Sequence, residues 1–194
     1  MKKIVYASIL SMSILSSNVL ANEKNIYLGV DILSSGNTFH IENKNTGKSI
    51  DSDVNSKAFK LKFGTVMDDN LRVQAYYQHE TYKETLYDET HDLLNEVGLD
   101  LIKGFEVTPK FLPFLQVGLG YGWMNVDGYS NRDTVNEISL KIGAGLMYQF
   151  TNTFEGIVGF DAQYRNWTDI EIYGQKALIS ETSRRLYIGV NIHF

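Results

Sequence analysis

Hydrophobic and polar residues alternate along most of the chain with a period of two, the pattern of a β-strand with one apolar face. The pattern recurs eight times, and the predicted strands lie at residues 26–32, 59–64, 71–78, 96–101, 115–123, 137–148, 158–165 and 185–194. In the sixth strand, Leu140 and Ile142 share one face, whereas Ser139 and Lys141 share the other. The sequence therefore predicts an all-β chain whose strands each have one apolar and one polar face.

The connections between these strands alternate in length. The longer, polar connections are 34–55, 83–91, 127–134 and 168–181, and the shorter ones are 67–70, 104–110 and 151–153. Aromatic residues gather at both ends of the apolar faces, for example Tyr121 and Tyr164 at one end and Tyr148 and Phe194 at the other. Short turns on one side, longer loops on the other and two aromatic girdles are typical of transmembrane barrels. The pattern predicts an eight-stranded antiparallel up-and-down transmembrane β-barrel.

The polar faces carry too many charges for the core of a soluble barrel. A soluble lipocalin-like barrel also alternates, but eight strands enclose too little volume to take the whole apolar face inward. We therefore expect the apolar face to contact lipid and the charged face to line the lumen, where opposite charges pair. Glu80 shares the polar face but is expected at a solvated rim. The predicted lumen network contains Asp31, Lys60, Lys62, Arg72, Glu96, Asp100, Glu137, Lys141, Asp161, Arg165 and Arg185.

Residues 1–21 have the features of a secretory signal peptide. Lys2 and Lys3 precede an apolar run over 4–17, and Val19 and Ala21 supply small residues for cleavage before Asn22. A membrane anchor is the alternative, but this run is shorter than the roughly 20 residues that a spanning helix needs. We predict cleavage between Ala21 and Asn22 and a mature barrel over residues 22–194.

Composition and charge narrow the possible functions. The chain has no cysteine, which excludes disulfides and thiolate metal sites. Its formal net charge is -5 and it has no basic stripe, so nucleic acid is not an expected partner.

Three segments resemble the small outer-membrane barrels of the OmpA/OmpX type, also described as porin-like. They are the glycine- and aromatic-rich runs 112–123 and 142–148 and the terminal strand 186–194. The resemblance implies a barrel in the outer membrane of a Gram-negative cell, exposed at the cell surface. It also implies that the terminal strand is a signal for the barrel assembly machinery, carried by Tyr187, Val190, Ile192 and Phe194.

The sequence offers no arrangement typical of catalysis. None of the four histidines has a serine two residues away, which resemblance to lipid A deacylases would require. Asp51, Asp53, Asp68 and Asp69 do not have the spacing of a calcium loop, and turn chemistry accounts for them. We expect no catalytic, cofactor-binding or metal site.

The leading hypothesis is a structural or surface-interaction barrel with a plugged, charged lumen. The alternative is a narrow porin-like channel for ions or small solutes, and a lipid-modifying enzyme comes third. Expected partners are outer-membrane lipid, the barrel assembly machinery, periplasmic chaperones and extracellular ligands of the loops, and the protein is expected to be a monomer.

Overall fold

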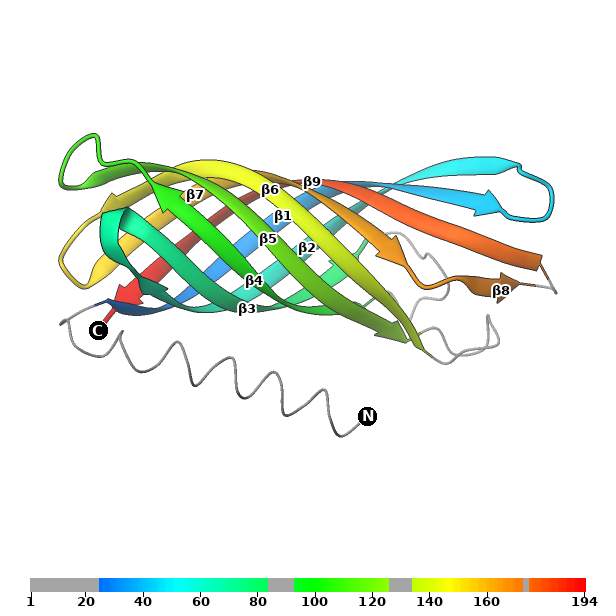
Figure 1. Ribbon diagram of the computed structural model, residues 1–194, viewed down its shortest axis with the longest axis horizontal. Coiled ribbons are helices and arrows are strands. Elements are labelled where there is room, and N and C mark those ends of the chain that lie inside the picture. The colour runs from blue at the N-terminus through cyan, green and yellow to red at the C-terminus, as the bar shows by residue number, and fades with distance from the viewer. Residues whose placement is uncertain (1–24, 84–92, 126–133, 173–174) are drawn as a thin grey trace.

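The computed structural model describes residues 25–83, 93–125, 134–172 and 175–194, without the side chains of residues 170–172 and 175. The described strands form one antiparallel sheet in the order β1-β2-β3-β4-β5-β6-β7-β9-β8. β1 also pairs with β9, so β1–β7 and β9 close into the predicted eight-stranded up-and-down barrel (Figure 1). The strands are β1 (Ile26–Asn43), β2 (Ser49–Val66), β3 (Leu71–Tyr82), β4 (Leu93–Gly104), β5 (Phe111–Asn125), β6 (Thr134–Gln149), β7 (Phe154–Trp167), β8 (Ile170–Ile172) and β9 (Gln175–His193). In the described part of the chain, no helix is long and apolar enough to cross a membrane.

The strand register fixes the shape of the barrel. A path that starts at Leu28 and steps to the paired residue on each next strand passes through Leu119 and Thr182 and returns to β1 at Thr38. The stagger is therefore ten residues over eight strands. With about 3.3 Å per residue and about 4.8 Å between strands, it corresponds to a tilt of about 40° from the barrel axis. A barrel of this size has an interior that side chains fill.

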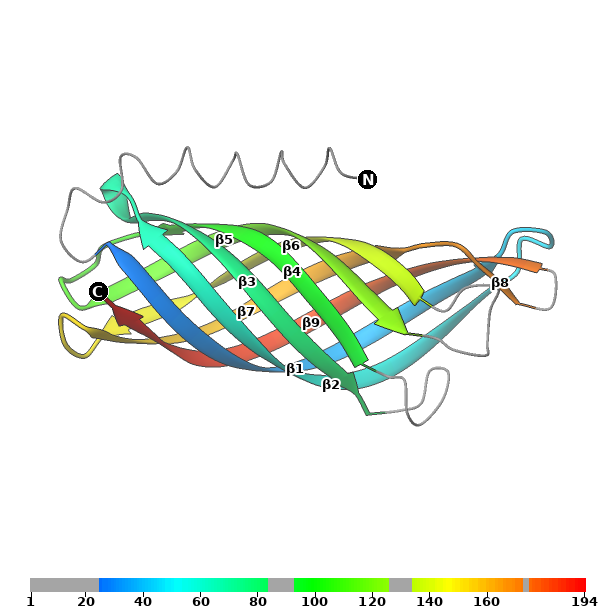
Figure 2. The same cartoon turned by 90° about the horizontal axis from the view of Figure 1, so that it is seen from below.

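The two ends of the barrel differ. The terminal end holds the first residues of β1, the last residues of β9 and the short turns, and the far end lies opposite (Figures 1 and 2). At the terminal end a 3₁₀ turn, η1 (Asp68–Asn70), joins β2 to β3, and Asp69 and Asn70 adopt positive φ values of 59° and 57°. Asp and Asn tolerate this left-handed conformation better than other non-glycine residues, which explains their presence in this turn.

The predicted apolar faces point outward. They form a band around the barrel that includes the exposed side chains of Leu99, Leu119, Leu140 and Ile188. The predicted polar faces point inward, and the structure buries them almost completely.

Two predicted loops are wrong. Residues 34–55 are mostly strand, because β1 continues to Asn43 and β2 begins at Ser49, and residues 168–181 contain β8 and the start of β9. At the far end, β1, β2, β8 and β9 extend beyond the other strands (Figure 1). The predicted connections 83–91 and 127–134 lie almost wholly outside the described residues.

The missed strand segments invert the amphipathic pattern. Near the terminal end of β1, Leu28 and Ile32 point outward, whereas Phe39 points inward and His40 outward at its far end. The strand keeps its phase, but its apolar residues move from the outside to the inside. The same inward apolar residues recur on the neighbouring strands and form a cluster inside the far end: Phe39, Val54, Tyr82, Leu94, Met124, Val135, Trp167, Ala177 and Ile179. We call this cluster the apolar cap.

Candidate functional site

The charged interior below the apolar cap is the main candidate site. Near the terminal end, Arg72 on β3 binds Glu155 on β7 through two hydrogen bonds of 2.7 and 2.8 Å. Asn191 donates a further hydrogen bond to Glu155 at 2.8 Å. The two parallel hydrogen bonds have the fork geometry typical of an arginine and a carboxylate. Because β3 and β7 lie on opposite walls of the barrel, this ion pair spans the lumen.

Two lysine–aspartate pairs occupy the middle of the lumen. Lys62 binds Asp31 at 2.6 Å, and Lys141 lies 2.7 Å from Asp100. Gln74 also donates to Asp100, at 2.8 Å. All of these side chains are at most 4% exposed, so each charge is compensated within the protein and not by bulk water.

Arg165 is the centre of the interior network. Its guanidinium lies 2.6 Å from Glu80, 2.8 Å from Glu181 and 3.3 Å from Glu96. It also donates to the hydroxyl of Tyr82 at 3.1 Å, which joins the network to the apolar cap above it. One fully buried cation thus ties together strands β3, β4, β7 and β9.

Two members of the predicted network lack the expected partners. Lys60 is buried and forms no ion pair among the described residues; its ammonium instead lies 4.9 Å from the ring centre of Tyr76 and 5.8 Å from that of Tyr187. Glu137 is buried, and neither of its carboxylate oxygens has a hydrogen-bond partner in the described part of the chain. Arg185, by contrast, binds Asp161 at 2.5 Å.

The structure adds three acidic residues that sequence reasoning placed elsewhere or missed. Glu80 is fully buried against Arg165 and is not part of a solvated rim. Glu155 and Glu181 fell outside the predicted strands, because the strands were drawn only as far as their apolar faces. Both have the spacing of an inward residue, since Glu155 lies six residues before Asp161 and Glu181 four residues before Arg185.

Glycines make room for the large aromatic residues of the lumen. A Cβ atom on Gly98 would lie 2.4 Å from the hydroxyl of Tyr76, and one on Gly159 would lie 2.3 Å from the ring of Tyr187. These glycines are therefore required as small residues beside the aromatic rings inside the lumen.

The residues of the predicted assembly signal do not share one face. Val190, Ile192 and Phe194 point outward at the terminal end, whereas Tyr187 points inward and donates a hydrogen bond to Gln116 at 3.2 Å. Three of the four residues therefore belong to the exposed row of the last strand, which also includes Leu186 and Ile188. The predicted cleavage residues Ala21 and Asn22 lie outside the described part of the chain.

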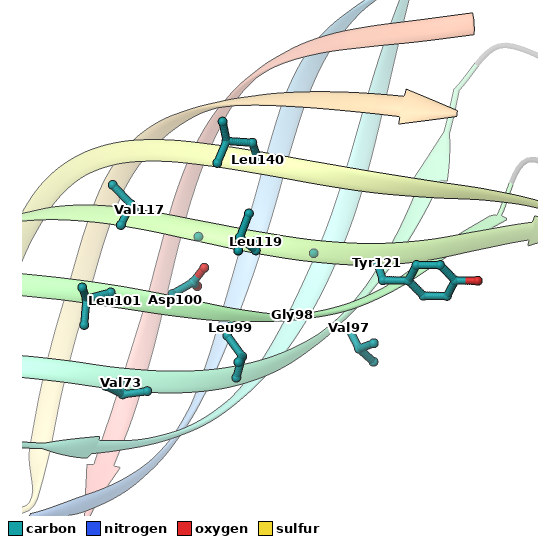
Figure 3. A pocket seen from close by; sticks show the side chains of 12 residues that line it. Val73, Val97, Gly98, Leu99, Asp100, Leu101, Val117, Leu119, Tyr121 and Leu140 are labelled. Carbon is teal, nitrogen blue, oxygen red and sulfur yellow. The ribbon is translucent and has the colours of Figure 1, made fainter. Parts of the chain in front are cut away.

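The outer wall has an apolar depression of about 580 Å³ over β4, β5 and β6 (Figure 3). Leu99, Leu119 and Leu140 line it, with Tyr121 at its far-end side. Asp100 is its one acidic lining residue, and its carboxylate turns into the barrel toward Lys141. The depression has hydrocarbon walls without an exposed nucleophile or base.

Other candidate chemistry on the described surface is sparse. No group of three or more His, Asp or Glu side chains there is arranged to hold a metal ion. Asp51 and Asp53 lie on the strand β2 and not in a turn. Asp51 contacts His40 at 2.7 Å, and Asp53 accepts a hydrogen bond from Thr38 at 2.7 Å. His79 contacts Asn95 at 2.9 Å on the outer wall.

Comparison with known proteins identifies the family. The sequence model described as outer membrane protein beta-barrel domain matches residues 7–194. The chain belongs to this outer-membrane β-barrel family. No curated protein matches the chain.

Solved structures agree on the fold. Neisserial surface protein A has a TM-score of 0.58 and 18% identity, over 87% of this chain and 97% of that one. OprG from Pseudomonas aeruginosa has a TM-score of 0.58 and 11% identity, over 91% of this chain and 99% of that one. The N-terminal barrel domain of OprF from the same species has a TM-score of 0.51 and 18% identity, over 86% and 97%. The chain is thus an outer-membrane β-barrel, and its apolar band contacts lipid.

Proposed function

We propose that this outer-membrane barrel is a closed, non-conducting protein that presents its far end at the cell surface as a structural or interaction surface. The observation that supports this most is the filled interior. Ion pairs occupy the lumen from Arg72 near the terminal end to Arg165 near the far end, and the apolar cap lies beyond them. A continuous water path would have to displace both the paired charges and the cap.

Planar-bilayer recording of the refolded protein tests closure. We expect no steady conductance above that of a protein-free bilayer at voltages of either sign. The positive control is a refolded double variant, Arg165→Ala with Trp167→Ala, which removes the centre of the network and part of the apolar cap. Conductance through this variant would show that the assay can detect an opened lumen. Discrete steady channels from the unmodified protein would contradict the proposal.

A narrow channel is the second candidate, and one observation favours it. Several buried polar atoms of the lumen have no partner among the described residues, including Arg185 Nη2, Ser139 Oγ and both oxygens of Glu137. Buried polar groups in proteins are usually satisfied by protein atoms or by ordered water. Hydration of these atoms would provide short wet segments, and the same bilayer recording decides whether they join into a path.

We further propose that the protein is not an enzyme. The depression of Figure 3 is lined by hydrocarbon, and its lining includes no serine, threonine or histidine. His40 lies 2.7 Å from Asp51 and pairs in register with Ser180, but no hydrogen bond joins His40 to Ser180 in the described part of the chain, so the serine is not activated by the histidine. Incubating the refolded protein in vesicles of bacterial lipids and analysing the lipids by mass spectrometry tests this. Any time-dependent lipid product absent from protein-free vesicles would contradict it.

The proposed orientation places the terminal end in the periplasm. The far end carries the extended strands β1, β2, β8 and β9, and the outward side chains at the far ends of β1, β2 and β9 are mainly polar. Because the chain has no cysteine, a single introduced cysteine can be labelled specifically. A membrane-impermeant maleimide should label Asn45→Cys in the β1–β2 turn on intact cells, and should label Thr151→Cys in the β6–β7 turn only after the outer membrane is opened.

Its assembly partners follow from the same architecture. We propose that the exposed row Val190, Ile192 and Phe194 is recognised by the barrel assembly machinery after periplasmic chaperones deliver the chain, and that the folded barrel is a monomer. Size-exclusion chromatography with light scattering in detergent tests the last point.

A further inference from the structure

The apolar band does not end at one level around the barrel. On β9, β1 and β2 the continuous run of outward apolar residues ends at Leu186, Ile32 and Phe59, and only Leu178 and Ile50, near the far tips of β9 and β2, lie further out. On the opposite wall the band continues to Tyr121, Ile138 and Tyr164. The polar surface therefore reaches further toward the terminal end on the β9–β1–β2 wall.

Two basic residues occupy this low part of the rim. Arg184 pairs in register with Ala162, two residue pairs closer to the terminal end than Tyr164, so it lies beside an apolar stretch of β7. Lys57 is the first outward residue beyond Phe59 on β2. From the strand rise and tilt, both Cα atoms lie within about 3 Å of the level of Tyr121 and Tyr164 along the axis. Because tyrosines of barrel girdles mark the headgroup level, the two cations lie at the headgroups as well.

A recess of about 360 Å³ lies beside Arg184 on this wall. Gly36 on β1 forms its floor, and its register partners Asn55 and Arg184 flank it. A Cβ atom added to Gly36 would meet no atom within 4 Å, so the glycine leaves open space. The remaining lining residues are Asn37, Thr38, Asp53, Val54 and Thr182.

The two basic side chains are available to a ligand. Both are exposed, and neither forms an ion pair or a side-chain hydrogen bond with the described part of the chain. The interior arginines, by contrast, all bind carboxylates. Basic side chains at a headgroup surface attract anionic lipid, and arginine binds phosphate oxygens in a planar fork.

The chemistry of the recess changes along the barrel axis. Its band side has Arg184, and Lys57 lies on β2 two residues from the lining residue Asn55, whereas its far side has Thr38, Thr182 and Asp53. Asp53 accepts a hydrogen bond from Thr38 at 2.7 Å, and its carboxylate would repel a phosphate but accept hydrogen bonds from sugar hydroxyls. From the membrane surface toward the far end, the recess therefore presents first a cation that can bind phosphate and then groups that can bind hydroxyls.

We propose that the recess of Gly36, with Arg184 and Lys57, binds the headgroup of a phosphorylated glycolipid of the outer leaflet. The phosphate contacts the two cations, and a sugar ring occupies the space above Gly36. A phospholipid supplies the phosphate but not the sugar, so it uses only half of the recess. The assignment to the outer leaflet rests on the proposed orientation of the barrel.

Nanodiscs with the same lipid in both leaflets test binding independently of that orientation. The refolded protein is placed in phosphatidylcholine nanodiscs doped with lipid A, with lipid A lacking its phosphates, or with phosphatidylglycerol, and lipids retained on the protein are counted by native mass spectrometry. Lipid A should be retained in preference to both other lipids. Equal retention of phosphatidylglycerol and lipid A would overturn the proposal in favour of a general anionic surface.

Three variants separate charge, space and fold. Lys57→Ala with Arg184→Ala should weaken lipid A binding about 30-fold, the effect of two basic residues at a headgroup surface. Gly36→Phe fills the recess without changing charge, and it should reduce the preference for lipid A over phosphatidylglycerol. Lys44→Ala with Lys48→Ala, in and beside the β1–β2 turn, is the charge-matched control and should bind like the unmodified protein. Unchanged lipid A binding in both of the first two variants, with a normal unfolding transition, would overturn the proposal.

Discussion

Replacement of Arg165 by alanine should destabilise the barrel strongly, because it leaves three buried carboxylates without their cation. Arg165 is fully buried and lies within 3.3 Å of Glu80, Glu96 and Glu181. Removal of one partner from a buried ion pair costs about 3–5 kcal/mol. With three carboxylates affected, we expect the upper half of that range.

Asp51→Ala is the matched control, because Asp51 also forms a close ion pair but at the surface. Its side chain is 68% exposed and lies 2.7 Å from His40. Exposed pairs of this kind contribute less than about 1 kcal/mol. The two variants should therefore differ by about 3 kcal/mol or more, which is more than a hundredfold in the unfolding equilibrium.

Equilibrium urea unfolding in phosphatidylcholine vesicles measures this difference, with the fluorescence of Trp123 and Trp167 as the probe. The double variant Arg165→Ala with Glu181→Gln should regain part of the lost free energy, because one uncompensated charge is removed with its partner. Equal free energies of unfolding for Arg165→Ala and Asp51→Ala would mean that the lumen is hydrated and that its ion pairs contribute little. That result would also favour the channel over the closed barrel.

Three further predictions address the wall, the packing and the mature chain. Leu140→Arg, in the middle of the lipid-facing band, should lower the free energy of unfolding in vesicles by about 2–4 kcal/mol. Asn136→Arg, nearer the far end of the same strand, should lower it by less than about 1 kcal/mol. Equal losses for the two variants would refute the assigned band. Gly98→Ala should destabilise the barrel by about 1–3 kcal/mol, because its Cβ would lie 2.4 Å from Tyr76 and from the backbone oxygen of Leu119, whereas Gly36→Ala should be neutral in the same urea assay. Intact-mass measurement of the protein from outer membranes should give a chain that begins at Asn22, and a mass that includes residues 1–21 would contradict the predicted signal peptide.

The strand count and the inside–outside assignment could be predicted because lipid and lumen impose a strict period of two. Leu140 and Ser139 illustrate the rule, since one is exposed on the wall and the other is buried inside. The same rule failed for residues 34–55, because Phe39 and Val54 are apolar on the inward face, where the band below has its polar residues. A strand predicted from outward apolar residues alone therefore ends too early, at the point where the apolar residues move to the inward face.

The individual partners in the lumen could not be predicted, because parity gives the direction of a side chain but not the stagger of the barrel. Arg72 meets Glu155 across the lumen, and Arg165 meets residues from three other strands. Such contacts depend on the ten-residue stagger, which follows from the pairing of all eight strands. Lys60 and Glu137 show that equal numbers of opposite charges on one face do not guarantee that each finds a counterpart.

The pairing of β1 with β9 has a consequence for the order of folding. This seam runs from Tyr27 opposite His193 to Asn43 opposite Ala177, so it joins the two segments of the barrel that are furthest apart in sequence. Neighbouring hairpins have local contacts and can form early, but the seam requires closure of the largest loop in the molecule. Until it forms, two strands would expose unpaired backbone groups to hydrocarbon, where each costs several kcal/mol. An incomplete sheet is therefore unstable in the bilayer, and we expect membrane insertion and closure of the barrel to occur in a single cooperative step.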